Sequence, residues 1–235
     1  MLADYPAETL HETIRDFHDT KKRLQALKNA VKEDVCHRAS GVQKEINFAL
    51  EHEEIADVFG DLLRKGELPL RVTHNDTKLN NVMIDLATGK GICVVDLDTV
   101  MPGLAMNDFG DAIRFGASTA LEDEKDLSKV SCNMELYEAY VKGFLESCGD
   151  KLTRKEIELL PMGAKVMTYE CGIRFLTDYL EGDHYYKIDR EEHNLDRCRT
   201  QFKLVKGYGT EMGYHAGNCA QVSEIDDFPR KIQWR

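Results

Sequence analysis

The sequence lacks the features by which several classes of protein are recognised. Its seven cysteines are odd in number and no two lie at C-x-x-C spacing, which argues against a disulfide framework and against a zinc site. No apolar run reaches the roughly 18 residues of a membrane-spanning helix. The first residues, Met1 to Asp4, lack the charged and apolar regions of a signal peptide. We therefore expect a cytoplasmic protein that does not bind membranes.

Positive charge is also in short supply. The chain has 31 Lys and Arg residues against 42 Asp and Glu residues, a formal net charge of −11 at pH 7. An acidic protein repels nucleic-acid backbones and anionic lipids, so neither is an expected partner. The one short basic run, Lys21 to Arg23, lies in a predicted helix and is typical of a solvated face.

Glycine-rich phosphate loops are missing as well. The sequence contains neither G-x-G-x-x-G nor a Walker motif. Gly207-Tyr208-Gly209 follows a predicted helix instead of a strand, so we expect it to mark a helix end. Residues 87–91 echo a phosphate loop but are predicted to form a hairpin turn.

What the chain does have is the composition of a globular protein. It is 42% hydrophobic and 31% charged over 235 residues, which is enough to bury a sizeable core. No internal repeat or low-complexity linker divides it. The end of the chain contains Pro229 and shows no periodicity. We predict one domain over residues 1–216 and a loose tail over residues 217–235.

The first part of the chain is predicted to be helical over residues 7–66. A later helix in this region is expected to begin at Ser40, because Ser40 and Gln43 have capping-box spacing, and to end at Gly66. Four apolar residues recur at spacings of three and four and so share one helix face: Leu24, Leu27, Val31 and Val35.

A short β-region follows the helices. Leu70 to Thr73 is a β-leaning run, and residues 81–85 and 91–96 flank a turn at 87–90, which is the pattern of a β-hairpin. We predict that this is the only β-structure in the chain.

From Asn107 onward the pattern is helical again. Thr153 and Glu156 have capping-box spacing, and a long helix is predicted over residues 163–180, ending before Gly182. Two apolar stripes mark further helices, one of Tyr137, Tyr140, Val141, Phe144 and Leu145, and one of Leu195, Cys198, Phe202 and Val205. The expected fold class is therefore α+β, mostly helical, with one small hairpin sheet.

The loop before the hairpin carries the residues suited to chemistry. From His74 to Asn81 it has the pattern H-x-D-x-K-x-x-N, and Asp96 ends the next predicted strand. Phosphoryl transfer to an alcohol needs a carboxylate to accept the hydroxyl proton, oxygen ligands for Mg²⁺ and a cation near the phosphate. Asp76 is the candidate base, Asn81 and Asp96 are the candidate ligands, and Lys78 is the candidate cation. Because a hairpin brings the ends of its strands together, Asn81 and Asp96 can share one ion.

Other interpretations of this loop remain open. Asp98 lies two residues beyond Asp96, on the same side of an extended chain, and is a candidate second metal ligand. A polar turn whose side chains bond their own backbone would also explain the Asp and Asn residues. A metallohydrolase would need more ligands at short spacing, whereas the eight histidines are scattered.

At these residues the sequence resembles the catalytic core shared by aminoglycoside phosphotransferases, choline kinases and protein kinases. More narrowly, it resembles N-acetylhexosamine 1-kinases in three segments, His74 to Met83, Val95 to Gly103 and Tyr169 to Asp178. The resemblance extends to about His215. It implies a protein-kinase-like C-terminal lobe that uses ATP and Mg²⁺ to phosphorylate the anomeric hydroxyl of a free N-acetylhexosamine.

The resemblance also implies roles for single residues. Asp76 would be the catalytic base, Asn81 and Asp96 would bind Mg²⁺, and His74 would brace the loop. Asp108 would support the loop from the start of a helix. The tripeptide that begins at Asp108 reads Asp-Phe-Gly, like the metal-binding motif of kinases, but Asp96 ends the strand adjacent to Asn81 and is the better ligand.

Sugar recognition is assigned by the same resemblance to Arg174, Tyr185 and Phe115. A guanidinium can donate two parallel hydrogen bonds to sugar oxygens, and an aromatic ring can cover the apolar face of a hexose. Arg174 lies in an apolar stretch, where a charged side chain is unusual unless it has a partner or a ligand. The alternatives are a structural ion pair for Arg174 and core packing for the two aromatic residues.

The nucleotide-gripping lobe of this superfamily lies upstream of the matching segments, and the chain begins too late to contain it. We therefore expect weak or no activity from the chain alone, and exposed apolar surface where that lobe would pack. A separate nucleotide-binding lobe and a homodimer are the expected protein partners. A gene fragment, a misassigned start and a split enzyme all fit this pattern.

Two rival functions stay open at this point. The acceptor could be choline, an aminoglycoside, homoserine or methylthioribose. A choline site is expected to have an aromatic cage, and an aminoglycoside site is expected to have many carboxylates. The chain could also be a non-catalytic sugar-binding module derived from a kinase.

Overall fold

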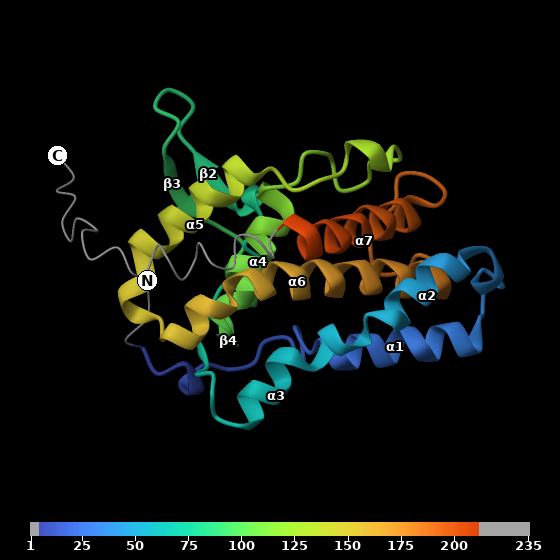
Figure 1. Ribbon diagram of the computed structural model, residues 1–235, viewed down its shortest axis with the longest axis horizontal. Coiled ribbons are helices and arrows are strands. Elements are labelled where there is room, and N and C mark those ends of the chain that lie inside the picture. The colour runs from blue at the N-terminus through green and yellow to red at the C-terminus, as the bar shows by residue number, and fades with distance from the viewer. Residues whose placement is uncertain (1–4, 212–235) are drawn as a thin grey trace.

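The computed structural model describes residues 5–211, so the predicted tail at 217–235 lies outside the described residues. The helices, shown in Figure 1, are α1 (Thr20–Glu33), α2 (Gln43–Glu51), α3 (Val58–Arg64), α4 (Ala105–Gly116), α5 (Met134–Cys148), α6 (Arg154–Glu181) and α7 (His193–Glu211). The strands are β1 (Arg71–Thr73), β2 (Val82–Ile84), β3 (Gly91–Val94) and β4 (Met101–Gly103). A mostly helical α+β fold is thus confirmed.

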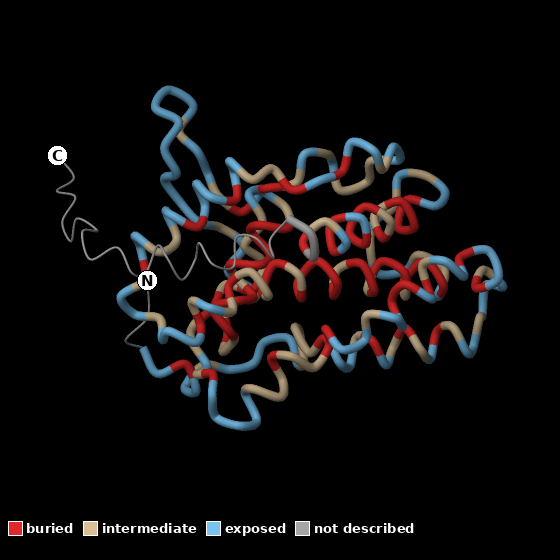
Figure 2. Tube along the Cα trace, viewed as in Figure 1, coloured by how far each residue is buried: buried red, intermediate tan, exposed pale blue. Residues whose placement is uncertain are grey.

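Helix α6 is the centre of the fold. It packs against α1, α4 and α7, and Figure 2 shows it buried along most of its length. It begins with the predicted capping box, in which Thr153 Oγ1 accepts from the Glu156 amide and Glu156 accepts from the Thr153 amide. It ends at Gly182, whose φ of 109° suits glycine. The separate helix predicted over residues 163–180 is therefore part of one 28-residue helix that runs through Pro161.

The N-terminal helices are shorter and more numerous than predicted. Leu24 and Leu27 are buried, but Val35 lies beyond the end of α1 and is exposed, because Asp34 has already turned the chain into a left-handed conformation. The capping box predicted at Ser40 is wrong. Val42 is the N-cap of α2 and makes no side-chain cap, and α2 and α3 are separate helices.

The predicted hairpin is confirmed. Strands β2 and β3 pair antiparallel, with Val82 opposite Val94, around a turn in which Gly89 has a φ of 69°. The prediction that this is the only β-structure is wrong. Strand β1 does not join the hairpin but pairs with β4, with Arg71 opposite Gly103. The catalytic-loop candidates therefore follow a strand of one sheet and precede a strand of the other.

Helices α4 and α6 approach each other through two glycines. A Cβ atom at Gly110 would lie closer than 3.0 Å to the backbone of Gly163, and a Cβ atom at Gly163 would lie as close to the Met106 carbonyl oxygen. Glycine is thus needed at both positions for this backbone contact. The contact fixes the position of α4, which carries Asp108 in its first turn.

The last two predicted apolar stripes are largely confirmed. In α5, Tyr137 and Val141 are buried, while Tyr140 is partly exposed. All four stripe residues of α7 are buried, namely Leu195, Cys198, Phe202 and Val205. The helix end predicted at 207–209 is wrong, since α7 continues to Glu211.

Two further observations concern the helices and the cysteines of residues 5–211. None of the described helices is long and apolar enough to cross a membrane. The six described cysteines, all but Cys219, are free thiols.

Candidate active site

The loop after β1 brings three predicted residues together. The side-chain amide of Asn81 donates to the backbone oxygen and to Oδ2 of Asp76, at 2.8 Å in each case. The ammonium group of Lys78 lies 2.8 Å from the same Oδ2. Among the described residues nothing donates to Oδ1 of Asp76, and 24% of the side chain is exposed. One carboxylate oxygen is thus held and the other is open to a ligand.

His74 ties this loop to the end of the hairpin. Its Nε2 lies 3.0 Å from the Val95 carbonyl oxygen, and the Asp76 amide donates to its Nδ1 at 3.3 Å. Because a carbonyl can only accept, the proton of the neutral ring belongs on Nε2. His74 therefore lies where a residue that braces the loop would lie.

Asp108 holds the same loop from the first turn of α4. Its Oδ2 accepts from the His74 amide at 2.9 Å and its Oδ1 accepts from the Asn75 amide at 2.7 Å. Its backbone oxygen accepts from the Thr77 hydroxyl at 2.5 Å. Burial raises the pKa of the Asp108 carboxyl to about 6, against the opposing effect of the two amide donors. This position agrees with the predicted supporting role.

The second and third candidate metal ligands lie just beyond β3. The Val95 amide donates to the Asn81 carbonyl at 2.9 Å, so the hairpin does bring residue 96 to the neighbourhood of Asn81. Asp96 does not end the strand as predicted but follows it in a left-handed conformation, with φ 62° and ψ 58°. Asp98 is exposed, and its backbone oxygen accepts from the Thr13 hydroxyl.

The donor set at this position suits a hard cation that keeps most of its water. Within residues 5–211, no group of three His, Cys, Asp or Glu side chains lies close enough together to hold a metal ion. Mg²⁺ commonly takes one or two carboxylates and several waters. Because the Nδ2 atom of Asn81 is bound to Asp76, its Oδ1 is left to act as a ligand together with Asp96. These residues fit Mg²⁺, provided that a phosphate completes its coordination.

A cleft with a volume of about 440 Å³ opens beside this loop. Its lining includes five of the predicted site residues, namely Asp76, Lys78, Phe115, Arg174 and Tyr185. The volume is within the range of small-molecule sites. Asn81, Asp96 and Asp98 are not part of the lining, and Asn81 reaches the cleft only through Asp76.

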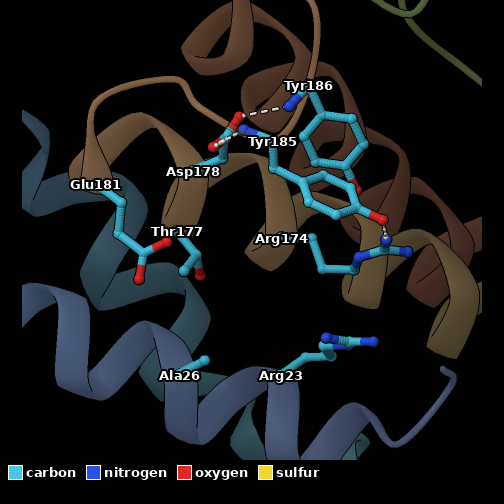
Figure 3. Close-up of a pocket in the computed structure, with 8 residues that line it drawn as sticks. All are labelled: Arg23, Ala26, Arg174, Thr177, Asp178, Glu181, Tyr185 and Tyr186. Atoms are coloured by element: carbon cyan, nitrogen blue, oxygen red, sulfur yellow. Dashed lines mark hydrogen bonds between the residues drawn. The ribbon is translucent and has the colours of Figure 1, made fainter. Parts of the chain in front are cut away.

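Arg174 is one of the cationic side chains that line the cleft. Its Nη2 lies 3.4 Å from the Tyr185 hydroxyl (Figure 3), and its guanidinium lies 5.5 Å from the Phe17 ring centre and 5.7 Å from those of Tyr185 and Tyr186. No described carboxylate forms an ion pair with it, so the alternative of a structural ion pair is not observed. Tyr185 is 69% exposed, so it is not a core residue, and Phe115 is half-buried.

Sequence reasoning missed a buried ion pair that also lines the cleft. His18 Nδ1 lies 2.8 Å from Glu170 Oε1, and His18 Nε2 lies 2.8 Å from the carbonyl oxygen of Asn75, the residue before Asp76. Burial opposes the charge on His18, but Glu170 outweighs it and the pKa of His18 is raised. Thr20 donates to the other oxygen of Glu170 at 2.5 Å. The available signal was a Glu in the most apolar part of a predicted helix.

A second ion-pair cluster was missed at the side of the cleft. Arg114 of α4 donates to Asp111 at 2.8 Å and to Glu122 at 2.6 Å, and both Arg114 and Asp111 are buried. The two carboxylates neutralise this guanidinium, so it is less available to a ligand than Arg174 is.

Comparison with protein families agrees with this geometry. A family model described as the phosphotransferase enzyme family matches residues 3–149, which is more than half of the chain and includes the whole loop and hairpin. Phosphoryl transfer requires a carboxylate that can accept a proton and a cation near the phosphate, and Asp76 and Lys78 lie together beside a cleft of small-molecule size. The chain belongs to the phosphotransferase enzyme family.

Proposed function

We propose that this phosphotransferase moves the γ-phosphoryl group of ATP to the anomeric hydroxyl of an N-acetylhexosamine. The observation that supports the proposal is the position of Asp76, which is held by Lys78 and Asn81 on one side and lines a cleft shared with Arg174 and Tyr185. Such a cleft can hold a sugar whose hydroxyl reaches the open carboxylate oxygen.

In the proposed reaction each candidate residue of the loop and the hairpin has one role. The open oxygen of Asp76 accepts the proton of the acceptor hydroxyl. The hydroxyl oxygen forms a bond to the γ-phosphorus while the bond from that phosphorus to the ADP oxygen breaks. Lys78, freed from Asp76 as the phosphate enters, offsets negative charge on the transferred group. Mg²⁺, held by Asn81 and Asp96 with Asp98 as a further ligand, would neutralise the phosphates of ATP. Asp108 and His74 keep the loop in place.

The charges of the cleft support a neutral or anionic acceptor. Glu170 is engaged by His18 and Thr20, so this carboxylate is not free for the amines of an aminoglycoside. The three aromatic rings that could cage a quaternary ammonium already surround the guanidinium of Arg174, which would repel choline. A hexosamine, with many hydroxyl oxygens and no required positive charge, is compatible with both observations.

The direct test is transfer from Mg-ATP to a panel of acceptors by the chain joined to a nucleotide-binding lobe, because the chain alone is expected to be weak or inactive. Transfer is followed by ³¹P NMR. The panel holds N-acetylglucosamine, N-acetylgalactosamine, choline, an aminoglycoside, homoserine and methylthioribose. We expect a sugar 1-phosphate signal from the hexosamines alone. A thermal-shift series on the same panel reports binding even where turnover is slow, since a ligand at 100 times its dissociation constant stabilises by about 2.7 kcal/mol.

Asp76→Asn is the matched catalytic control. Without the proton acceptor the transfer rate should fall by about 10²–10⁴-fold, with an unchanged circular dichroism spectrum. A wild-type rate in this variant would end the assignment of Asp76. Preferred binding and phosphorylation of another acceptor would keep the enzyme class and replace the hexosamine.

A further inference from the structure

A second and smaller cavity adjoins the cleft on the other side of Arg174. It has a volume of about 170 Å³ and lies between α1, α6 and the segment that follows α6. Arg174, Tyr185 and Tyr186 line both cavities, so they form the wall between them. Figure 3 shows the guanidinium groups of Arg23 and Arg174 at one end of this cavity, and Glu181 and Thr177 at the other.

Arg23 brings to this cavity a guanidinium that has no ion-pair partner among the described residues. The sequence pattern predicts a solvated face for residues 21–23, and Lys21 and Lys22 are exposed and paired with Asp57 and Asp16. Arg23 differs, because it is half-buried and no described carboxylate pairs with it. Its Nη2 donates to the backbone oxygens of Phe17 and Asp16, at 3.0 and 3.3 Å, and its buried Nε has no partner in the described structure.

Arg174 offers the second free guanidinium. Its one hydrogen bond among the described residues is the 3.4 Å contact with the Tyr185 hydroxyl. Charged groups removed from water are ordinarily paired, since leaving them unpaired costs free energy. Glu170 acts electrostatically on Arg174 and Asp16 on Arg23, but neither carboxylate forms an ion pair with these arginines. Several N–H donors of the two guanidiniums at one end of the cavity therefore stay available to an anion.

The two carboxylates that line the cavity, Asp178 and Glu181, form no ion pair with either arginine. Asp178 accepts from the amides of His184, Tyr185 and Tyr186, at 2.8 to 3.0 Å, and from the Asn194 side chain, so its oxygens are used to hold the loop that carries the tyrosines. Glu181 makes no ion pair with either arginine. Burial and the nearby Asp178 raise the pKa of Glu181.

We propose that Arg23 and Arg174 together bind an oxyanion, a carboxylate or a phosphate group, in this cavity. Guanidinium groups recognise such groups through paired N–H donors, and the Tyr185 hydroxyl adds another polar contact. The volume is large enough for one oxyanion with ordered water. Because Arg174 borders both cavities, an acceptor in the cleft can place an anionic substituent here, and this last step alone rests on the proposed function.

The binding test uses isothermal titration calorimetry of the whole chain with inorganic phosphate. Arg23→Gln should weaken phosphate binding by about tenfold or more, the loss of one charge-assisted contact. Arg15→Gln is the control, because it removes the same charge from the same segment at a side chain that is 87% exposed. Phosphate affinity in Arg15→Gln should stay within about twofold of wild type.

Further variants and ligands distinguish a folding defect, a failure of the transfer proposal and a failure of the anion site. If Arg23→Gln does not fold, Arg23→Lys keeps the charge and should bind phosphate more weakly than wild type but measurably. A wild-type protein that binds phosphate but transfers no phosphoryl group would keep this site and refute only the proposed transfer. N-acetylglucosamine 6-phosphate and glucuronate, compared with N-acetylglucosamine, test whether the anion belongs to the acceptor: Arg23→Gln should weaken the charged sugars only. No saturable phosphate binding by wild type, or equal losses in the Arg23 and Arg15 variants, would overturn the proposal.

Discussion

His18 ties the catalytic loop to helix α6. It joins the segment before α1 to Glu170 of α6 and to the carbonyl of Asn75 beside Asp76. Both ring nitrogens lie on acceptors, an arrangement that the charged imidazolium satisfies fully. Since His18 and Glu170 are both buried, removing one partner leaves an uncompensated charge and costs about 3–5 kcal/mol.

The pair makes the stability of the protein depend on pH. The pKa of His18 is raised above its value of 6.5 in an unfolded chain, so the folded state holds a proton that the unfolded state releases. The stabilisation is complete below pH 6.5 and is lost as the pH rises through the folded pKa. We expect the free energy of unfolding, measured with denaturant from pH 6 to pH 9, to fall with pH in wild type and to change less in His18→Gln. His11→Gln, an exposed site in the same segment, should behave as wild type, and an equal pH dependence in all three proteins would contradict the assignment.

At the level of the elements, the packing of α4 on α6 decides where the loop is held. Gly110 and Gly163 let the two backbones meet, and α4 then presents Asp108 to the amides of His74 and Asn75. A methyl group at either glycine would force the helices apart. Activity and stability are therefore linked through this one contact.

Gly110→Ala should lower the free energy of unfolding by about 1–3 kcal/mol, because the added methyl group meets backbone that cannot move aside. It should also slow transfer, since Asp108 shifts with α4. Gly143→Ala in α5 is the matched control. Nothing lies within 4 Å of its added Cβ, so it should stabilise by about 0.5–1 kcal/mol through helix propensity. Equal effects of the two substitutions on denaturant midpoints would refute the packing argument.

Much at this scale could be predicted from local pattern. The hairpin, the capping box of α6 and the apolar stripes of α5 and α7 follow from residue spacing, and they were predicted. The pairing of β1 with β4 was not, because three-residue strands separated by 27 residues carry no local signal of their partner. The continuity of α6 through Pro161 was also hidden, since proline usually interrupts a helix and here packing overrides it.

For the whole molecule, the β2–β3 hairpin and the residues just before and after it form a surface rich in exposed apolar side chains. Figure 1 shows the hairpin projecting from the body of the protein. Its exposed apolar side chains are Leu79, Met83, Ile84, Leu86, Ile92, Val94 and Leu97. So many neighbouring apolar side chains indicate a surface that another protein covers. This agrees with the prediction of a nucleotide-binding lobe or a second copy as partner, which stays a prediction.

The chain is therefore expected to self-associate when nothing else covers this hairpin. Sedimentation velocity over about 1–100 μM should show a concentration-dependent dimer or larger species. Ile92→Lys, which puts a charge into the patch, should weaken the association by about tenfold or more. Leu121→Lys changes an exposed leucine outside the hairpin and should have no effect. A monomer at every concentration in wild type would remove the hairpin as a self-association surface.

The sequence by itself determined the class of chemistry. The loop from His74 to Asn81 holds the proposed base, the proposed cation and a proposed metal ligand within eight residues, so their proximity follows from the covalent chain and one hairpin. Only the tertiary structure decided what surrounds them. His18 meets Glu170 across 152 residues, and Arg23 meets Arg174 at the end of one cavity, because α1 packs on α6. Residue spacing can predict neighbours along a helix or a hairpin, but it holds no information about which helices pack together.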